Sequence, residues 1–409
     1  MTKTPDSVTN RIRCFVYIAF LWGMKDFVLF MYFLFLCSCS LEQIGQGPRS
    51  DADGVWRGPS YGKHMSGTVY AVAMDYPDGY DWKADPGSGQ VEGIHIVMYA
   101  DGAPVLKIPV GDLYETSSDP QRLRVRSGHL YTDYTDGNEM VIKKDGQEIL
   151  RYEGAEEVVS LEVMDGMVHM LCIPSSGVGF VYRIDGKVAV ERDMGSLYGP
   201  LEIHNGTAGF CFSNKSGHYM VEDGKVFLME VDKDVTDVLD MCLSEGQPCL
   251  LVATEGASAP AMIRKGIRLY DDYYESKDII SARFLETDSL CVRLRCRDGN
   301  SDLLSDVLMF GDGLSRRPRR ACQLLSVVVD ESGYHAVANP SEVQGGAIIS
   351  NRDSYDLPSG YHVYGDGCAV TRDSVLYVGL TSGKGQCPVI WMGGTLDTLD
   401  VNGPLVCLR

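Results

Sequence analysis

Residues Val158 to Asp193 read VVSLEVMDGMVHMLCIPSSGVGFVYRIDGKVAVERD and contain four short apolar runs. The runs are rich in Val, Ile and Tyr, and turn residues separate them at Asp165-Gly166, at Pro174 to Gly177 and at Asp185-Gly186. A two-residue hairpin needs positive φ at its central positions, which Gly, Asp and Asn tolerate best. The stretch therefore predicts four antiparallel strands joined by tight turns.

The same unit recurs along the chain as two interleaved series of turns. One series has spacings of 38 to 47 residues and falls at Asp101-Gly102, Asp145-Gly146, Asp185-Gly186, Asp223-Gly224, Lys265-Gly266, Asp312-Gly313, Asn351-Arg352 and Gly393-Gly394. The other falls at Ser66-Gly67, Ser127-Gly128, Asp165-Gly166, Asn205-Gly206, Glu245-Gly246, Asp288-Ser289, Ser332-Gly333 and Asp373-Ser374. A period of roughly 40 residues with four strands is typical of a propeller blade.

The repeat predicts an all-β fold: one β-propeller of four-stranded antiparallel blades over residues 66–409. Eight repeats indicate eight blades, and an atypical repeat would reduce the count to seven. The C-terminal residues Gly403 to Arg409 (GPLVCLR) resemble the beginning of the fourth repeat at Gly199 (GPLEIHN), whereas the first repeat lacks such a strand. We therefore expect the C-terminal strand to complete the first blade and close the ring.

The order of strands and turns resembles the NHL-type propeller repeat. In both, a first strand ends at a Gly turn, a Val-Tyr-Val-like strand follows, and a third strand ends at Asp-Gly. The resemblance covers residues 66–409 and implies a propeller fold. It leaves function open, because propellers include both enzymes and scaffolds.

The N-terminus has the pattern of a secretory signal. Lys25 precedes ten apolar residues from Phe27 to Leu36, and the sequence Leu-Cys-Ser-Cys ends at Cys39. This ending resembles the lipobox of Bacteroidetes-type lipoproteins, which implies lipidation of Cys39. We expect residues 1–39 to be a signal segment with Met24 as the true start. A signal anchor is the alternative, but two charges in its middle would be costly.

Residues 40–65 are rich in Gly, Ser, Asp and Pro and predict a flexible tether. The protein is thus expected to be anchored by lipid in a bacterial cell envelope, at the outer membrane, facing the periplasm or the surface. Its net charge of −19 disfavours a nucleic-acid partner. We expect a monomer whose partner is a glycan or an envelope protein.

Metal and catalytic motifs are weak. Neither C-x-x-C nor a ligand-spaced His pair occurs, so no cofactor is expected, and most cysteines fall within strands. A disulfide between cysteines of neighbouring strands is an alternative, and its pairing cannot be assigned from the sequence alone. The segments Asp133 to Glu139 and Asp298 to Asp302 offer oxygen ligands, which makes calcium the alternative. The basic run Arg316 to Arg320 is either a docking point for an anionic ligand or a solvated connection.

Ligand binding is expected on the face where connections from several blades converge. The candidate residues there are Tyr76, Tyr80, Asp81, Trp82, Tyr134, Tyr198, Tyr273 and Tyr274. Of these, Tyr198, Tyr273 and Tyr274 are expected in connections between blades. Aromatic rings with a polar group suit glycan or protein recognition. The sequence therefore favours a non-catalytic binding module. The alternative is a carbohydrate hydrolase or lyase that uses acidic pairs such as Asp81/Asp85 or Asp271/Asp272.

Overall fold

A computed structural model shows how these repeats fold. It describes residues 64–65, 67–83, 91–110, 123–255, 260–269, 279–285, 291–297, 304–310, 315–316, 322–330, 333–340, 346–350, 354–363, 369–372, 375–382 and 387–409. The chain divides into residues 1–50 and 51–409, and every described residue belongs to the second part. None of the described segments forms a helix that is long and apolar enough to cross a membrane.

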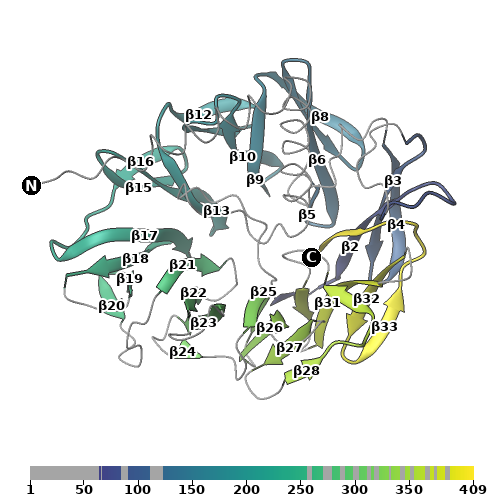
Figure 1. Ribbon diagram of the computed structural model, residues 1–409. Coiled ribbons are helices and arrows are strands. Elements are labelled where there is room, and N and C mark those ends of the chain that lie inside the picture. Colours follow the sequence, from purple (N-terminus) through teal and green to yellow (C-terminus); the bar gives the residue numbers. More distant parts are fainter. Residues whose placement is uncertain are drawn as a thin grey trace, which may run out of the picture. The chain divides into compact units, whose positions relative to one another are not determined.

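Eight antiparallel sheets follow one another around an axis (Figure 1). Blade 1 contains β34 (Leu405–Leu408), β2 (Tyr70–Asp75), β3 (His95–Ala100) and β4 (Ala103–Pro109). Blade 2 contains β5 (Leu123–Arg126), β6 (His129–Asp136), β7 (Glu139–Lys144) and β8 (Gln147–Glu153). Blade 3 contains β9 (Glu156–Met164), β10 (Met167–Pro174), β11 (Phe180–Ile184) and β12 (Lys187–Arg192). Blade 4 contains β13 (Ser196–His204), β14 (Thr207–Asn214), β15 (Gly217–Glu222) and β16 (Lys225–Leu228).

The second half of the ring continues the pattern. Blade 5 contains β17 (Val235–Ser244), β18 (Gln247–Thr254), β19 (Ala261–Arg264) and β20 (Ile267–Leu269). Blade 6 contains β21 (Ile279–Leu285), β22 (Cys291–Arg297), β23 (Leu304–Phe310) and β24 (Ser315–Arg316). Blade 7 contains β25 (Cys322–Asp330), β26 (Gly333–Pro340), β27 (Ala347–Ser350) and β28 (Ser354–Asp356). Blade 8 contains β30 (Ala369–Arg372), β31 (Val375–Ser382), β32 (Pro388–Met392) and β33 (Thr395–Thr398). The prediction of an eight-bladed propeller is confirmed.

The C-terminal strand closes the ring, as the sequence predicts. In blade 1, β34 pairs with β2 so that Leu408 lies opposite Ala71. The N–H of Arg409 donates to the carbonyl of Tyr70 over 2.7 Å. Blade 1 is thus built from both ends of the propeller, and β34 pairs with the strand β2 that follows the junction.

Blade 8 departs from the predicted repeat in two ways. A short strand β1 (His64–Met65) pairs in parallel with β30, so regular structure begins before the predicted boundary at residue 66. A second short strand, β29 (Tyr361–Val363), pairs with β31 beside β30. Gly67 therefore follows a strand of blade 8, and the prediction that Ser66-Gly67 forms the first hairpin of blade 1 is wrong.

The Asp-Gly turns hold two hairpins of a blade together. Asp185 has a φ of 48° and belongs to the turn between the third and fourth strands of blade 3. Its N–H donates to the carbonyl of Val168, and its carboxylate accepts the N–H of Val168 over 2.8 Å. The same double contact joins Asp101 to Val69, Asp145 to Leu130 and Asp223 to Ala208. Asp therefore suits this position for its side chain as well as its backbone.

Blade 5 shows why one repeat replaces this Asp. The position that corresponds to Val168 is Pro248, which has no N–H to donate. The position that corresponds to Asp185 is Lys265, which also has a positive φ, of 52°. A carboxylate at position 265 would find no N–H donor at position 248. This explains why blade 5 has Lys where blades 1 to 4 have Asp.

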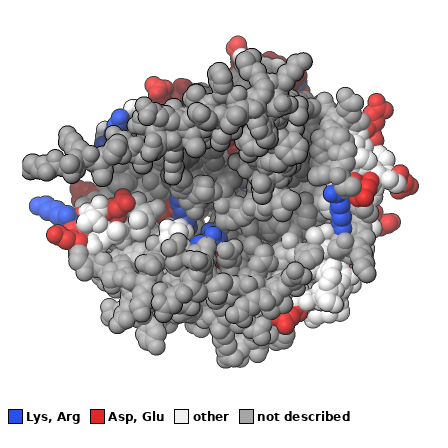
Figure 2. Space-filling view, viewed as in Figure 1, with Lys and Arg blue, Asp and Glu red and all other residues white. Residues whose placement is uncertain are grey.

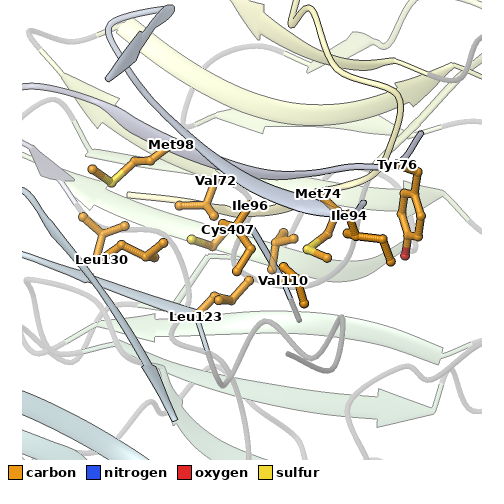
Figure 3. Packing of buried hydrophobic residues seen from close by; sticks show 12 residues of the cluster. Val72, Met74, Tyr76, Ile94, Ile96, Met98, Val110, Leu123, Leu130 and Cys407 are labelled. Atoms are coloured by element: carbon orange, nitrogen blue, oxygen red, sulfur yellow. The ribbon is translucent and has the colours of Figure 1, made fainter. Parts of the chain in front are cut away.

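Apolar side chains fill the space between blades. Figure 3 shows the cluster between blades 1 and 2, which includes Val72, Met74 and Ile96 from one blade and Leu123 and Leu130 from the next. All five are at most 1% exposed. Alternation along each strand places such residues on both faces of a sheet, and each face packs against a neighbouring blade.

Polar side chains connect the inner strands of adjacent blades. Arg124 of β5 forms a buried ion pair with Asp133 and donates to the carbonyl of Val158 in β9 over 2.6 Å. Asp240 of β17 accepts the N–H of Phe284 in β21 over 2.8 Å. Buried charges are costly unless they are paired and hydrogen-bonded, and these contacts supply both needs while fixing how adjacent blades align.

Candidate functional site

The aromatic residues predicted for the first blade pack against its core. Tyr76 is buried in the cluster of Figure 3, and its ring stacks on that of Tyr80 with centroids 5.2 Å apart. Tyr80 and Trp82 are half-buried against the same cluster. Burial raises the pKa of the Tyr76 hydroxyl above its ordinary value. These rings thus help to stabilise the connection between β2 and β3.

The C-terminal segment holds this connection in place. The side-chain amide of Asn402 donates to the carbonyls of Pro77 over 3.0 Å and Tyr80 over 3.1 Å. Asp81 is exposed, and its carboxylate accepts the N–H of Lys83 over 3.2 Å. The closing C-terminal segment therefore contacts the described part of this connection directly.

Two of the other predicted tyrosines lie in strands of blades 2 and 4. Tyr134 is in β6, with the ammonium of Lys143 4.6 Å from its ring centre. Tyr198 lies inside β13 and is buried, where it accepts a hydrogen bond from Ser213 over 3.3 Å. Its placement in a connection between blades is therefore wrong. Tyr273, Tyr274 and Cys39 lie outside the described residues, as do Asp85, Asp271 and Asp272.

Arginines pair with acidic side chains of residues 133–139, the first segment that offers oxygen ligands for calcium. Asp133 pairs with Arg124, and Arg151 binds Asp136 and Glu139, each over 2.9 Å. Among the described residues, no group of three or more His, Cys, Asp or Glu side chains is placed to hold a metal ion. The second acidic segment, residues 298–302, and the basic residues 317–320 lie outside the described part of the chain.

Figure 2 shows where the described acidic side chains lie on one face of the molecule. On the face shown in Figure 2, they lie around the rim and form no continuous patch among the described residues. On this face, the described acidic residues therefore form no single anionic surface.

A polar groove lies between blades 4 and 5, on the face that carries the two-residue turns (the hairpin face). Its volume is about 650 Å³, within the range typical of small-molecule sites. The lining combines carboxylates with neutral hydrogen-bonding groups and one ammonium: Glu202, Glu222, Glu245, His204, Asn205, Thr207, Gln247 and Lys265. We call this the hairpin-face groove.

Two glycines keep the hairpin-face groove open. A Cβ on Gly209 would lie 2.7 Å from Leu243 and 2.9 Å from the carbonyl oxygen of Val221. A Cβ on Gly246 would lie 2.9 Å from the ring of His204, and its φ of +68° also favours glycine. Side chains at these positions would push the walls of the groove apart.

Local contacts orient the polar groups of the hairpin-face groove. The guanidinium of Arg264 binds Glu245 over 2.6 Å, and Asn205 lies 2.8 Å from Nε2 of His204. An irregularity in β13 precedes them, since Tyr198 lies opposite Cys211 whereas Glu202 lies opposite Gly209. Three residues of β13 therefore face a single residue of β14. A bulge changes which side chains face the groove. Strand alternation in the sequence alone therefore does not predict that Glu202 and His204 line it.

A second groove lies between blades 3 and 4, on the opposite face, where the longer connections run (the loop face). Its volume is about 530 Å³. Val178 and Met194 line it and are 55% and 56% exposed, and Lys215 lies at the same groove. Below it, the rings of Phe180 and Phe212 pack with centroids 4.8 Å apart. We call this the loop-face groove, and it lies on the face for which binding was predicted.

Comparison with known proteins adds only distant likenesses. No family model and no curated protein sequence matches the chain. Among solved structures, the dihydro-heme d1 dehydrogenase NirN shares 9% identity at a TM-score of 0.47, over 86% of this chain and 76% of that one. Apo AztD from Citrobacter koseri shares 10% at a TM-score of 0.45, over 83% and 97%.

A Quinonprotein alcohol dehydrogenase-like protein from Bacteroides thetaiotaomicron shares 11% identity at a TM-score of 0.33, over 87% of this chain and 95% of that one. Likenesses this distant say nothing about activity. The blades themselves define the class: the protein is an eight-bladed β-propeller. Its function must be argued from its grooves.

Proposed function

We propose that the protein is an extracytoplasmic, non-catalytic binding module that holds a glycan in the hairpin-face groove. The observation that carries the proposal is the gathering of eight polar or charged side chains around one groove of about 650 Å³. Sugars present many hydroxyl groups, and a rigid surface with both donors and acceptors can match them.

The charges of the hairpin-face groove narrow the class of glycan. Three carboxylates, from Glu202, Glu222 and Glu245, line the groove with the ammonium of Lys265, and the guanidinium of Arg264 pairs with Glu245, so one negative charge remains in excess. Like charges repel strongly where solvent is partly excluded, so an acidic sugar would be disfavoured. The ligand we propose is a neutral or amino-substituted oligosaccharide.

The proposed location follows from the N-terminus. The apolar run Phe27 to Leu36 and the lipobox-like ending at Cys39 support export and lipid attachment. Bacterial lipoproteins carry more than one acyl chain, and two chains suffice for stable anchoring. The propeller would then be presented on a tether at the cell envelope.

A thermal-shift screen against neutral, amino and acidic oligosaccharides tests the proposal. A ligand at a hundredfold excess over its Kd should stabilise the fold by about 2.7 kcal/mol. Glu222→Gln and Gln247→Ala should reduce this shift, because both side chains are exposed in the groove. Glu191→Gln, an exposed acid on β12 of blade 3, is the matched control and should leave the shift unchanged. If no oligosaccharide stabilises the protein, the glycan proposal fails.

The same experiment separates binding from catalysis. The enzyme alternative requires two carboxylates at a sugar bond, and three glutamates line the hairpin-face groove. Incubating the protein with the bound oligosaccharide and separating the products by chromatography decides the matter. An unchanged oligosaccharide supports a binding module, and shortened products that disappear in Glu222→Gln support a hydrolase or lyase.

The loop-face groove favours a second candidate, a protein partner. Its exposed Val178 and Met194 suit an apolar side chain, and Lys215 suits a neighbouring carboxylate. A displayed peptide library should then yield sequences that pair apolar with acidic residues. Val178→Asp should abolish their binding, whereas Val188→Asp, an equally apolar exposed position on outer strand β12, should not. Enrichment that survives Val178→Asp would contradict this candidate.

A further inference from the structure

Two cysteines face each other across the inner hairpin of blade 5. Cys242 of β17 and Cys249 of β18 are direct partners in the antiparallel register, and both are buried. Their thiols lie close enough to hydrogen-bond. Cys242 and Cys249 are therefore two thiols in contact on directly paired strands.

The register sets the geometry that a bond between them would have. Ser244 lies opposite Gln247 and closes the two-residue turn, and Leu243 lies opposite Pro248. Pairs that exchange backbone hydrogen bonds alternate with pairs that do not, and Pro248 suits a position without them because it has no N–H. Cys242 and Cys249 therefore occupy a hydrogen-bonded position, where Cα atoms lie about 5.5 Å apart.

That separation allows a disulfide but does not make it relaxed. Disulfides span Cα distances of about 4.4–6.8 Å, so the backbone need not move far. At hydrogen-bonded positions, however, opposite Cβ atoms lie farther apart than the roughly 3.5–4.5 Å that a relaxed disulfide prefers. Strained disulfides are more easily reduced and tend to be labile or regulatory.

We infer that Cys242 and Cys249 form a reversible disulfide, which cross-links the inner hairpin of blade 5. The inference rests on the register and the thiol contact, and it holds whether or not the hairpin-face groove binds a glycan. The cross-link would nevertheless act on that groove, because Leu243, Gly246 and Gln247 of the same hairpin line it.

The chemistry is a thiol–disulfide exchange with a small organic disulfide as oxidant. Cys249 attacks first, since its hydrogen bond with Cys242 holds the pKa of its thiol below the ordinary value, while burial raises the pKa of Cys242. Cys249 loses its proton and its sulfur bonds to one sulfur of the oxidant. The sulfur–sulfur bond of the oxidant breaks, and its other sulfur takes up a proton and leaves as a thiol. Cys242 then loses its proton and attacks the Cys249 sulfur, which releases the second thiol. The two cysteines are oxidised and the oxidant is reduced to two thiols.

The test is to equilibrate the folded full-length chain with hydroxyethyl disulfide and its thiol at a series of ratios. Each sample is quenched with acid, unfolded, alkylated with N-ethylmaleimide and digested with trypsin. Both cysteines then lie in the peptide of residues 234–264, and cleavage after Glu245 separates them. We expect this peptide to lose its alkylation as oxidant increases, its two halves to stay joined, and excess thiol to restore both alkylations.

Matched variants make the result specific. Cys249→Ser should leave Cys242 alkylated or joined to the small thiol, whereas Cys211→Ser, a nearby buried cysteine on β14, should leave the cross-link intact. Circular dichroism of each equilibrated sample establishes that the protein is folded. Full alkylation of both cysteines in folded protein at the highest ratio, a link to Cys211, or a cross-link that excess thiol cannot reverse would each overturn the inference.

Discussion

Asp185 and Val168 bind each other twice: the N–H of Asp185 donates to the Val168 carbonyl over 2.9 Å, and the Asp185 carboxylate accepts the Val168 N–H over 2.8 Å. The contact joins the two hairpins of blade 3. Its recurrence in blades 1, 2 and 4 gives the Asp-Gly repeat a physical cause beyond turn propensity.

Replacing this Asp should therefore destabilise the blade. Asp185→Ala removes a charged acceptor and leaves a residue with a Cβ at positive φ, and we expect a loss of about 2–3 kcal/mol in the free energy of unfolding. Asp185→Asn keeps an oxygen acceptor and tolerates the backbone, so it should lose less. Urea denaturation measures both variants. Lys265→Ala at the corresponding turn of blade 5 is the control, and an equal loss there would contradict the explanation.

The buried pair between Arg124 and Asp133 predicts strong non-additivity. Asp133→Leu leaves the Arg124 guanidinium buried without its carboxylate and should cost about 3–5 kcal/mol. The double variant Arg124→Met with Asp133→Leu removes both charges and should cost less than the sum of the single changes. A double-mutant cycle followed by urea denaturation measures this coupling. Additive losses would show that the two residues act independently.

His169 should make the propeller less stable in mild acid. Its ring is buried, with Nδ1 2.7 Å from the Tyr182 hydroxyl, and burial lowers its pKa below the ordinary value. Asp185 and Asp223 oppose this shift without reversing it. The unfolded chain then binds a proton more readily than the folded one. The stability that neutral His169 provides is complete above about pH 6.5 and falls as the pH decreases toward the folded pKa.

Urea midpoints at about pH 7.5 and about pH 5.5 test this prediction, since the ordinary pKa of His lies between them. Between these two pH values, the urea midpoint of His169→Gln should decrease less than that of the native protein. The comparison must be between the two proteins, because burial also lowers the pKa of His218 and both proteins share that effect. An identical decline in both would exclude His169 as a source.

If Cys39 is the lipidated residue, its replacement should prevent labelling of the protein by a fatty acid. Cys39→Ser should abolish incorporation of a radioactive fatty acid when the full chain is expressed in a bacterium that makes lipoproteins. Cys37→Ser, two residues earlier, is the control and should still be labelled. Label retained by Cys39→Ser would place the modification elsewhere.

The sequence predicts the blades well because their determinants are local. Turn residues at Asp145-Gly146 or Asn205-Gly206 specify hairpins without reference to distant parts of the chain, and the repeat of GPL at residue 403 indicates the closing strand. Strand β1 escapes prediction because two residues carry no periodic pattern. Its pairing with β30 depends on a neighbour more than 300 positions away.

The candidate sites are less predictable because they lie between blades. Tyr198 looks like a connection residue in the sequence, yet it lies inside β13 opposite Cys211 and is buried. The bulge in β13 precedes Glu202 and His204 at the hairpin-face groove. Register and packing between two sheets decide which side chains share a groove, and neither can be read from a single strand.

Hydrogen–deuterium exchange with and without the best oligosaccharide from the thermal-shift screen tests the central claim most directly. If the hairpin-face groove binds the glycan, added protection should be confined to the strand ends and turns near residues 202–209 and 243–247. Protection near residues 174–179 and 193–197 instead would move the site to the loop-face groove. Protection in neither place would contradict the assignment of glycan binding to these grooves.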